Sequence, residues 1–376
     1  MKRDVAIIGG SASGFFTAYL LAREGLQVRL FEAAEDIQPS PRTLIVTSYM
    51  RDLMGSLSES SVINEIRRIE LFTDERAATI SLNRPDLVID RSKLIQRLIE
   101  KAEDSGATVL TGQRFVSCTP NGNNIRFTVS GNGNGKRVEE TANVLVGADG
   151  AFSNVAQSAG WPKQPTVPLF QAIVELPKYM PSDVTRVWFI PEETPYFYWL
   201  IKYSPARGVV GLIGENDHEV RGSLERFLEK KGLEPIEFQS AEVPRYAQWI
   251  PNPRRIGESH VYLVGDAAGH VKVSTMGGIV TGFRGALGVA EAILNGGSSR
   301  EFRVFRRELD RHNLIRSVLH NFTQADYARL LDLLNPRVKR SLSVFSRDET
   351  SKLLVHAFLS QPRLLLLSLR ALLTGK

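Results

Sequence analysis

Cysteine is nearly absent from the chain: Cys118 is the only one in 376 residues. A single thiol excludes an internal disulfide framework and a cysteine-rich zinc or iron–sulfur site. No apolar run is long enough to cross a membrane, and the opening Met1-Lys2-Arg3 is not followed by the apolar run of a secretion signal. We therefore expect a globular protein of the cytoplasm.

Metal and hydrolase signatures are also missing. The six histidines do not have the spacing of metal ligands, and the sequence contains no Ser-His-Asp hydrolase elbow. We therefore expect neither a metal site nor a hydrolase mechanism. The chain does contain three short glycine motifs, each of which follows an apolar run.

The first motif reads Gly9-Gly10-Ser11-Ala12-Ser13-Gly14 and follows the apolar run Val5–Ile8. This pattern predicts a buried parallel strand, a tight turn whose N–H groups approach a pyrophosphate, and a helix whose positive end faces that anion. Ser11 occupies the position of the usual middle glycine. A second apolar run, 27–31, ends at Glu32, whose carboxylate would accept hydrogen bonds from ribose hydroxyls.

The second and third motifs repeat this pattern. Val144–Val146 leads to Gly147-Ala148-Asp149-Gly150, and Val261–Val264 leads to Gly265-Asp266. One such turn would suit any nucleotide, or be a glycine turn that binds nothing. All three motifs in this order indicate FAD.

The periodicity predicts an α/β fold with a discontinuous Rossmann-type FAD-binding domain, formed by residues 1–165 and 244–297. Helices are expected at 12–24, 92–105, 220–230 and 278–294. Residues 166–243 contain four expected strands punctuated by Pro and Gly, which indicates an inserted antiparallel β-sheet domain that binds substrate. Residues 298–376 are expected to be a C-terminal helical segment.

Charge is concentrated in this C-terminal segment. The net charge of the chain is +6, but residues 300–376 carry fifteen Lys and Arg against seven Asp and Glu, a balance of +8. On charge alone, a membrane surface and a nucleic acid both fit as partners. The leucine-rich end, Pro362–Leu373, would either lie in a membrane interface with Arg363 and Arg370 toward the headgroups, or pack on the domain or on another subunit.

With these motifs together, the chain resembles the FAD-dependent reductases and monooxygenases that fold like para-hydroxybenzoate hydroxylase. Within that superfamily it is most similar to the geranylgeranyl reductase family. Gly269 and the stretch Thr275-Met276-Gly277-Gly278 resemble prenyl reductases, whereas monooxygenases usually carry His and then Pro after the Gly-Asp-Ala-Ala stretch. The resemblance covers most of the chain, from Val5 to the C-terminal helices.

The resemblance implies FAD contacts at each motif. In the family, the loop of Asp149 lies near the pyrophosphate, Asp266 bonds a ribitol hydroxyl, and the Gly277-Gly278 turn faces the pyrimidine edge of the flavin. Arg91 would reach the FAD phosphates and Arg42 would flank the cofactor, although either could instead be a solvated arginine. The expected cofactor-binding residues are Gly9, Ser11, Gly14, Glu32, Arg42, Arg91, Asp149, Gly265, Asp266, Gly277 and Gly278.

A strand rich in aromatic residues, Tyr196 to Ile201, resembles a strand of the reductases and matches it at Trp199. The resemblance implies that Tyr196, Phe197 and Trp199 wall a substrate cavity over the flavin, and the alternative is an ordinary aromatic core strand. The sequence identifies no catalytic proton donor. His270 and Tyr198 are candidates, and a structural role is the alternative for His270.

Three functions follow from these expectations. The first is reduction of the C=C bonds of a polyprenyl chain by hydride transfer from reduced FAD. The second is FAD-dependent hydroxylation of an apolar or aromatic substrate by a monooxygenase. The third is a flavin-binding electron carrier or a membrane-binding module without turnover.

The expected partners follow from the same reasoning. They are an apolar small molecule or lipid as substrate, and NAD(P)H or ferredoxin as electron donor. Peripheral attachment to a membrane is expected, and a nucleic acid is not.

Overall fold

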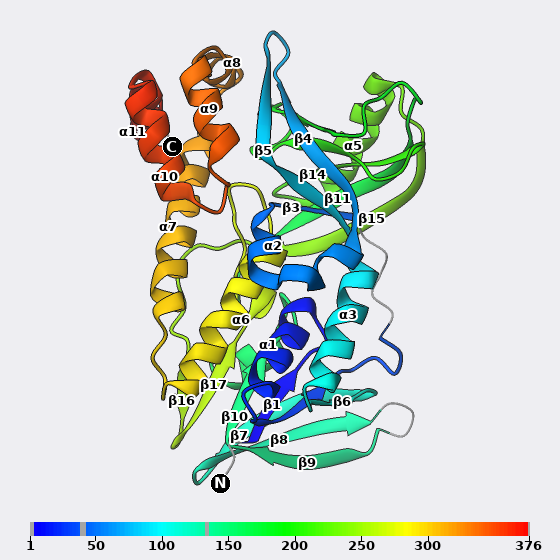
Figure 1. The fold of residues 1–376 in the computed structure, drawn as a ribbon, viewed down its shortest axis with the longest axis vertical. Coiled ribbons are helices and arrows are strands. Elements are labelled where there is room, and N and C mark those ends of the chain that lie inside the picture. Colours follow the sequence, from blue (N-terminus) through cyan, green and yellow to red (C-terminus); the bar gives the residue numbers. More distant parts are fainter. Residues whose placement is uncertain (1–3, 38–42, 132–134, 375–376) are drawn as a thin grey trace. The chain divides into compact units, whose positions relative to one another are not determined.

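The structure is a computed structural model that describes residues 4–37, 43–131 and 135–374 (Figure 1). The chain forms two compact units, and each is made of three segments. The first unit consists of Met1–Arg42, Arg91–Pro165 and Pro244–Asp310. The second consists of Thr43–Asp90, Thr166–Val243 and Arg311–Lys376.

A six-stranded sheet is the centre of the first unit, with the strand order β16-β17-β10-β1-β2-β6. All neighbouring strands are parallel except β16 and β17. The strands are β1 (Asp4–Ile8), β2 (Gln27–Phe31), β6 (Thr108–Leu110), β10 (Val144–Gly147), β16 (Arg254–Ile256) and β17 (Ser259–Leu263). This mostly parallel sheet is the Rossmann-type arrangement that the alternating pattern predicts.

Helices cover one face of this sheet and a small antiparallel sheet covers the other (Figure 1). The helices are α1 (Ala12–Ala22), α3 (Arg91–Asp104) and α6 (Ile279–Leu294), and the small sheet contains β7 (Gln113–Asn121), β8 (Asn124–Gly131) and β9 (Arg137–Ala142). A short helix, α4 (Asn154–Ser158), and a 3₁₀ turn, η3 (Gly265–Ala268), complete the unit. Alternate residues of β1, Ala6 and Ile8, pack toward the small sheet, as period-two strand geometry requires.

The helices differ in how the sequence buries them. In α1, ten of eleven residues are buried, because this helix is apolar on every side and packs against α3 and α6. In α3, the buried residues Leu94, Ile95, Leu98 and Ala102 recur at helical spacing along one face only. The expected helix at 92–105 is therefore confirmed.

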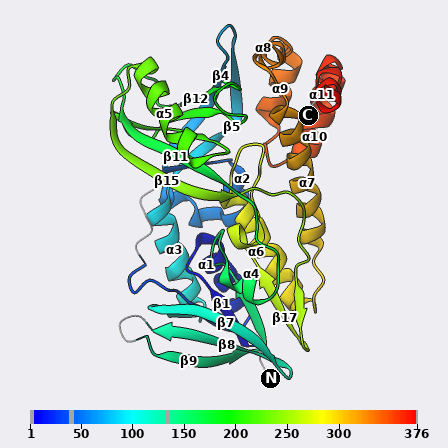
Figure 2. The ribbon, with the colours of Figure 1, turned by 180° about the vertical axis from the view of Figure 1, so that it is seen from behind.

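An eight-stranded sheet dominates the second unit, with the order β15-β11-β14-β13-β12-β4-β5-β3 (Figure 2). Its strands are β3 (Thr43–Val46), β4 (Val62–Phe72), β5 (Ala77–Asp90), β11 (Thr166–Glu175), β12 (Val184–Trp188), β13 (Tyr198–Lys202), β14 (Arg207–Ile213) and β15 (Pro235–Pro244). The pairing of β12 with β4 is parallel, and the other registers resolved in this sheet are antiparallel. Helix α5 (Asp217–Lys231) packs on β11 and β14.

Residues 43–90 differ from the expected organisation. The sequence analysis groups them with the FAD-binding domain, whereas in the structure they form β3, β4 and β5 of the eight-stranded sheet. The short elements α2 (Tyr49–Met54), η1 (Gly55–Leu57) and η2 (Glu59–Ser61) lie in the same segment. The physical reason is a long-range pairing: β4 pairs with β12, more than a hundred residues away, and local periodicity carries no sign of that partner.

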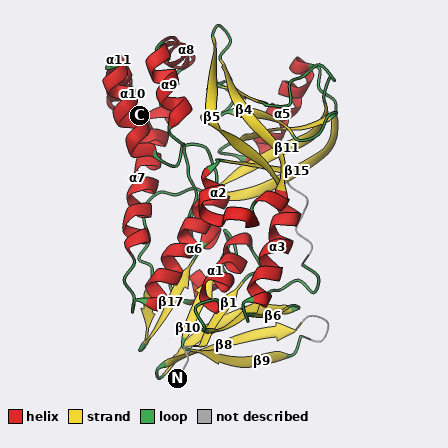
Figure 3. Ribbon diagram, in the orientation of Figure 1, coloured by secondary structure: helices red, strands yellow, loops and turns green. Residues whose placement is uncertain are grey.

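The C-terminal part is helical, as expected (Figure 3). Its helices are α7 (Arg300–His320), α8 (Gln324–Asp332), α9 (Pro336–Val344), α10 (Thr350–Ser360) and α11 (Arg363–Thr374). The division between the two units falls within α7, after Asp310. Thr323 and Asp326 form a capping box at the start of α8, so each satisfies a backbone N–H of the other.

Candidate cofactor site

Four consecutive strands of the parallel sheet end at polar or glycine-rich motifs. In the order β17-β10-β1-β2, these ends carry Gly265-Asp266, Asp149, Gly9 and Glu32. The carboxyl ends of parallel strands meet at one edge of a sheet, so motifs as far apart in the chain as Gly9 and Asp266 come to the same edge. This edge is where open α/β sheets bind nucleotides.

The turn after β1 has room only for glycine. Gly9 has a φ of +107°, and a Cβ on it would lie 2.5 Å from the carbonyl oxygen of Ala148. A Cβ on Gly14 would lie 2.3 Å from the carbonyl oxygen of Gly9. Ser11 turns its hydroxyl back onto the helix, where Oγ accepts a hydrogen bond of 3.1 Å from the N–H of Gly14. The serine at the middle position of the motif therefore acts as the N-cap of α1.

Glu32 is tied to this turn by two backbone hydrogen bonds. The N–H of Gly10 donates to Oε2 at 2.6 Å, and the N–H of Ala34 donates to Oε1 at 2.8 Å. A carboxylate has about four acceptor positions, so each oxygen keeps a lone pair for a ribose hydroxyl. Glu32 can therefore hold the glycine turn and a sugar at the same time.

Asp149 organises the next strand end. Its Oδ1 accepts a hydrogen bond of 2.5 Å from the Ser153 hydroxyl, and its Oδ2 accepts one of 3.1 Å from the N–H of Val155. Burial raises the pKa of Asp149 above its ordinary value of 3.8, and the hydrogen bonds from Ser153 and the backbone offset only part of that rise. The observed partners of Asp149 belong to its own loop and to α4.

A backbone hydrogen bond bridges the loop that links β17 to α6. Asp266 lies in η3 and is exposed, and its Oδ1 would be 3.3 Å from a Cβ placed on Gly278, the N-cap of α6. The N–H of Lys272 donates to the carbonyl oxygen of Gly277 at 3.0 Å, which closes the loop. Gly269 has a φ of +66°, a backbone conformation that favours glycine, and a Cβ there would lie 2.6 Å from Oε1 at the end of the flexible Gln164 side chain.

The two candidate arginines have different outcomes. Arg91 is the first residue of α3 in the first unit and is half-buried. Arg42 lies outside the described residues, so its expected contact with the cofactor stays a prediction.

His270 lies in an apolar cluster of the first unit. Its ring stacks on Trp249 with the ring centroids 5.6 Å apart and meets Phe305 edge-on at 5.1 Å. Its Nδ1 has no hydrogen-bond partner among the described residues, and burial lowers the pKa of His270 to about 3. At neutral pH the imidazole is uncharged, which fits the structural role better than proton donation.

The aromatic residues 196–199 divide between two faces of the second unit's sheet. Trp199 lies on the face that also carries Ile66, Val88 and Ile201, and the ring of Phe197 meets it edge-on with the centroids 6.0 Å apart. Both side chains are partly exposed. Tyr196 precedes β13 and is buried.

Tyr198 points to the opposite face, as the period of a strand requires. It is fully buried, stacks on Phe227 of α5 with the centroids 4.3 Å apart, and donates a hydrogen bond from its hydroxyl to Glu193. Burial and the neighbouring Glu193 carboxylate raise the pKa of Tyr198 well above the ordinary value of 10.0. A phenol in this environment keeps its proton, which indicates a core role.

Arg316 of α7 is a residue that the sequence analysis did not single out. It is 5% exposed, and its guanidinium lies over the ring of Tyr196 at 4.7 Å from the centroid. Nη2 donates to the carbonyl oxygen of Pro195, whereas Nε and Nη1 have no partner among the described residues. The sequence offers little signal for it, because α7 contains five other arginines.

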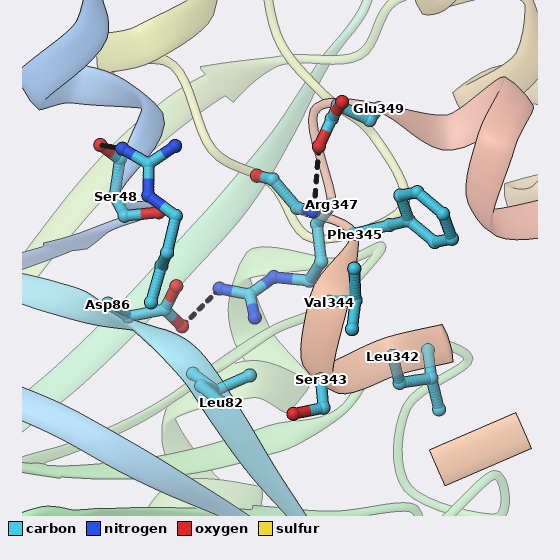
Figure 4. A pocket seen from close by; sticks show the side chains of 11 residues that line it. Ser48, Leu82, Asp86, Leu342, Ser343, Val344, Phe345, Arg347 and Glu349 are labelled. Carbon is cyan, nitrogen blue, oxygen red and sulfur yellow. Dashed lines mark hydrogen bonds and ion pairs between the residues drawn. The ribbon is translucent and has the colours of Figure 1, made fainter. Parts of the chain in front are cut away.

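A small cavity of about 70 Å³ lies in the second unit, beside β5 and the segment that joins α9 to α10 (Figure 4). Arg347 donates to Asp86 at 2.5 Å, and Arg84 pairs with Asp52 at 2.8 Å. Asp348 accepts a hydrogen bond from the Thr47 hydroxyl. These ion pairs neutralise one another, and the Arg347–Asp86 pair links the segment after α9 to β5. The described charged groups beside the cavity therefore offer no unbalanced charge to a ligand.

Two kinds of feature are absent from the described part of the chain. No group of three His, Cys, Asp or Glu residues there is placed to hold a metal ion. Among the described helices, none combines the length and the apolar character needed to cross a membrane.

The family model described as "FAD binding domain" matches residues 2–295. The chain belongs to this family. The prediction of an FAD-dependent oxidoreductase is confirmed, and FAD is its cofactor. The residues at the carboxyl edge of the parallel sheet fit that cofactor, because Gly9 and Gly10 are partly exposed beside the capped start of α1.

Curated relatives confirm the resemblance to geranylgeranyl reductases. The digeranylgeranylglycerophospholipid reductase 2 of Methanothermobacter thermautotrophicus is 27% identical over 74% of this chain and 74% of its own length. The geranylgeranyl diphosphate reductase of Rhodobacter capsulatus is 27% identical over 81% of this chain and 79% of its own length. The probable electron transfer flavoprotein-quinone oxidoreductase of Escherichia coli is 24% identical over 85% of this chain and 84% of its own length.

Solved structures confirm the fold. A geranylgeranyl bacteriochlorophyll reductase-like protein of Thermoplasma acidophilum aligns with a TM-score of 0.79 at 19% identity, covering 97% of this chain and 98% of that one. The p-nitrophenol 4-monooxygenase of Pseudomonas putida aligns with a TM-score of 0.64 at 17% identity, over 100% and 99% of the two chains. Reductases and monooxygenases thus share this architecture, which by itself does not select between them.

Proposed function

We propose that this enzyme reduces C=C bonds of a polyprenyl chain. The observation that carries the proposal is the pair of prenyl reductase relatives, each similar over about three quarters of both chains. The loop from Gly269 to Gly278 supports it, since Gly269 has a left-handed φ of +66° and is the residue that prenyl reductases have there. FAD, once reduced, supplies the hydride.

The proposed roles of the cofactor-site residues follow from where they lie. The turn of Gly9, Ser11 and Gly14 and the start of α1 bind the pyrophosphate, with Arg91 as a second phosphate contact. Glu32 binds the adenosine ribose while it holds the N–H of Gly10. Asp266 accepts a hydrogen bond from the ribitol chain. Asp149 and Gly265 shape the edge, and the N–H groups of Gly277 and Gly278 stabilise negative charge on the flavin.

The substrate face is proposed on the second unit. Phe197 and Trp199 are the partly exposed aromatic residues there, and they supply the apolar contacts that a prenyl chain requires. The neighbouring Tyr196 is held by the buried guanidinium of Arg316, which lies over its ring. We leave Tyr198 and His270 out of the proposed proton-transfer group, because both are buried in apolar cores.

Partners are proposed from the same chemistry. An electron donor is required, and NAD(P)H and ferredoxin are the two candidates. A polyprenyl substrate is held in bilayers, so we also propose that the enzyme attaches peripherally to a membrane.

The second candidate function is hydroxylation of an apolar substrate, because the p-nitrophenol 4-monooxygenase shares this fold. One experiment separates the two. The purified protein is reduced without oxygen, geranylgeranyl diphosphate is added, and the flavin spectrum and product mass are followed. Reoxidation of the flavin with a product that gains pairs of hydrogen atoms supports the reductase. A product that gains oxygen, and forms only in air, would establish the monooxygenase instead.

A further inference from the structure

Helix α11 has two apolar stripes, and only one of them is covered. Leu364, Leu367 and Ala371 are buried and pack in a cluster with Tyr327 and Phe322. The carbonyl oxygen of Ala371 accepts a hydrogen bond of 3.2 Å from Nδ2 of Asn321. These contacts account for the fold of the C-terminal end, and α11 is therefore a packed helix of the second unit.

The other stripe is exposed. Five leucines recur at i, i+1, i+4, i+7 and i+8, the spacing of one face of an amphipathic helix. Their exposed fractions run from 40% at Leu372 to 86% at Leu373. The members of this leucine stripe are Leu365, Leu366, Leu369, Leu372 and Leu373. Scattered exposed leucines need no explanation, but five on one face of a twelve-residue helix form a patch that indicates an interaction surface.

Helix α10, which contacts α11, also carries exposed apolar residues, and this end of the chain is basic. On α10, Val355 and Leu359 are 56% and 77% exposed. Residues 350–376 contain four Lys and Arg and no Asp or Glu. At 100° per residue, Arg363 and Arg370 fall between the leucine stripe and the buried stripe, and both are exposed.

This combination selects the occupant. In a symmetric contact with another copy, the same segment would face itself, so its basic residues would need acidic partners within that segment. Residues 350–376 contain no Asp or Glu that could pair with them. An apolar stripe with basic residues at its border, in a segment without acidic residues, matches an anionic lipid surface. A helix of twelve residues is too short to span a bilayer and long enough to lie along one.

We propose that the leucine stripe of α11 is the membrane-docking element of this protein, buried among lipid headgroups with Arg363 paired to anionic lipid. The choice of lipid as occupant rests on the proposed function, which gives the enzyme a bilayer-resident substrate. Arg370 contributes less, because its guanidinium also lies 3.9 Å from the Asp326 carboxylate.

The test uses the full chain and measures vesicle binding in the absence of substrate and reductant. Wild-type protein is titrated with vesicles of phosphatidylcholine alone and of equal parts phosphatidylcholine and phosphatidylglycerol. The triple variant Leu366→Gln, Leu369→Gln, Leu373→Gln removes the stripe and keeps residues that favour helix. A matched variant, Ile236→Gln, Val304→Gln, Leu314→Gln, alters three exposed apolar residues outside the stripe. Deleting α11 would be unsuitable, since Leu364 and Leu367 belong to the core.

Wild type and the matched variant should bind the anionic vesicles, and the stripe variant should bind them at least about thirtyfold more weakly. Arg363→Glu should weaken binding to the vesicles that contain phosphatidylglycerol by about fivefold or more, and should leave binding to pure phosphatidylcholine vesicles unchanged. Flavin absorbance and circular dichroism should be unchanged in every variant.

Equal binding by the stripe variant and wild type would overturn the proposal. The proposal would also be overturned if the wild-type protein were a dimer that does not bind vesicles and the stripe variant were a monomer, because the stripe would then hold two copies together. Because no turnover is measured, failure of reductase activity would leave the vesicle result standing. A loss of docking would likewise leave turnover of a substrate dispersed in detergent intact.

Discussion

The two units of this protein present their chemistry in different ways. In the first unit, the candidate site consists mainly of backbone: glycines at strand ends, a capped helix start and a carboxylate that holds the turn. In the second unit, the candidate substrate face consists of side chains such as Phe197 and Trp199 on a broad sheet. A backbone site tolerates almost no substitution at its glycines, whereas a side-chain wall can change its residues and keep its fold. This difference explains how one architecture serves both reductases and monooxygenases.

The largest expected effect tests the backbone site. Gly9→Ala places a Cβ 2.5 Å from the carbonyl oxygen of Ala148 at a φ of +107° and should lower the unfolding free energy by about 3 kcal/mol or more, with loss of FAD. Gly25→Ala is the matched control, because Gly25 has a φ of +80° and open space around its Cβ position. It should cost about 1 kcal/mol and leave FAD bound. If Gly9→Ala and Gly25→Ala lowered the unfolding free energy equally in urea, the positive φ would account for both effects and the close approach to Ala148 would contribute nothing.

His270 gives the first unit a dependence on acid. Its folded pKa of about 3 lies below that of an exposed imidazole, so the unfolded chain binds a proton that the folded chain refuses. Its contribution to stability is complete above pH 6.5 and falls by about 1.4 kcal/mol per pH unit as the pH drops from 6.5 toward 3. The difference in unfolding free energy between His270→Leu and wild type should therefore shift in favour of the variant at low pH. If the difference in unfolding free energy between variant and wild type stayed constant from pH 6.5 to 3, the folded chain would protonate His270 as readily as the unfolded chain does, and this expectation would be wrong.

Glu32 tests whether the carboxylate that holds the turn also binds the cofactor. Glu32→Ala removes the acceptor of Gly10 N–H and the proposed ribose acceptor, and should weaken FAD binding by about 1–3 kcal/mol in a fluorescence titration. Glu35→Ala, an exposed acid three residues away, is the control and should bind FAD as wild type does. Unchanged affinity in Glu32→Ala would confine Glu32 to a role in the fold.

Trp199 and Tyr198 separate the two faces of one strand. Trp199→Ala should lower kcat/KM for a prenyl substrate by about tenfold or more while FAD stays bound, because a large apolar contact is lost. Tyr198→Phe should keep turnover and lower the unfolding free energy by about 1 kcal/mol, since it loses the hydrogen bond to Glu193. A turnover defect in Tyr198→Phe and none in Trp199→Ala would reverse the assignment of the faces.

Much of the first unit could be predicted from the sequence because its signals are local. Apolar runs before Gly9, Gly147 and Gly265 predicted the strands β1, β10 and β17, which the structure confirms. Their adjacency follows from the handedness and pairing rules of parallel sheets. The second unit was harder, since β4 and β5 join the sheet through a partner that no local pattern announces.

The sequence by itself determined the cofactor, the three glycine motifs at the strand ends, and the basic, leucine-rich end. The tertiary structure alone decided which face each side chain occupies. It placed Tyr198 under α5 and Trp199 on the other side, buried Arg316 over Tyr196, and divided the leucines of α11 into a packed stripe and an exposed one. Motifs depend on neighbours in sequence, whereas burial depends on which distant segments pack, and only the folded chain brings those together.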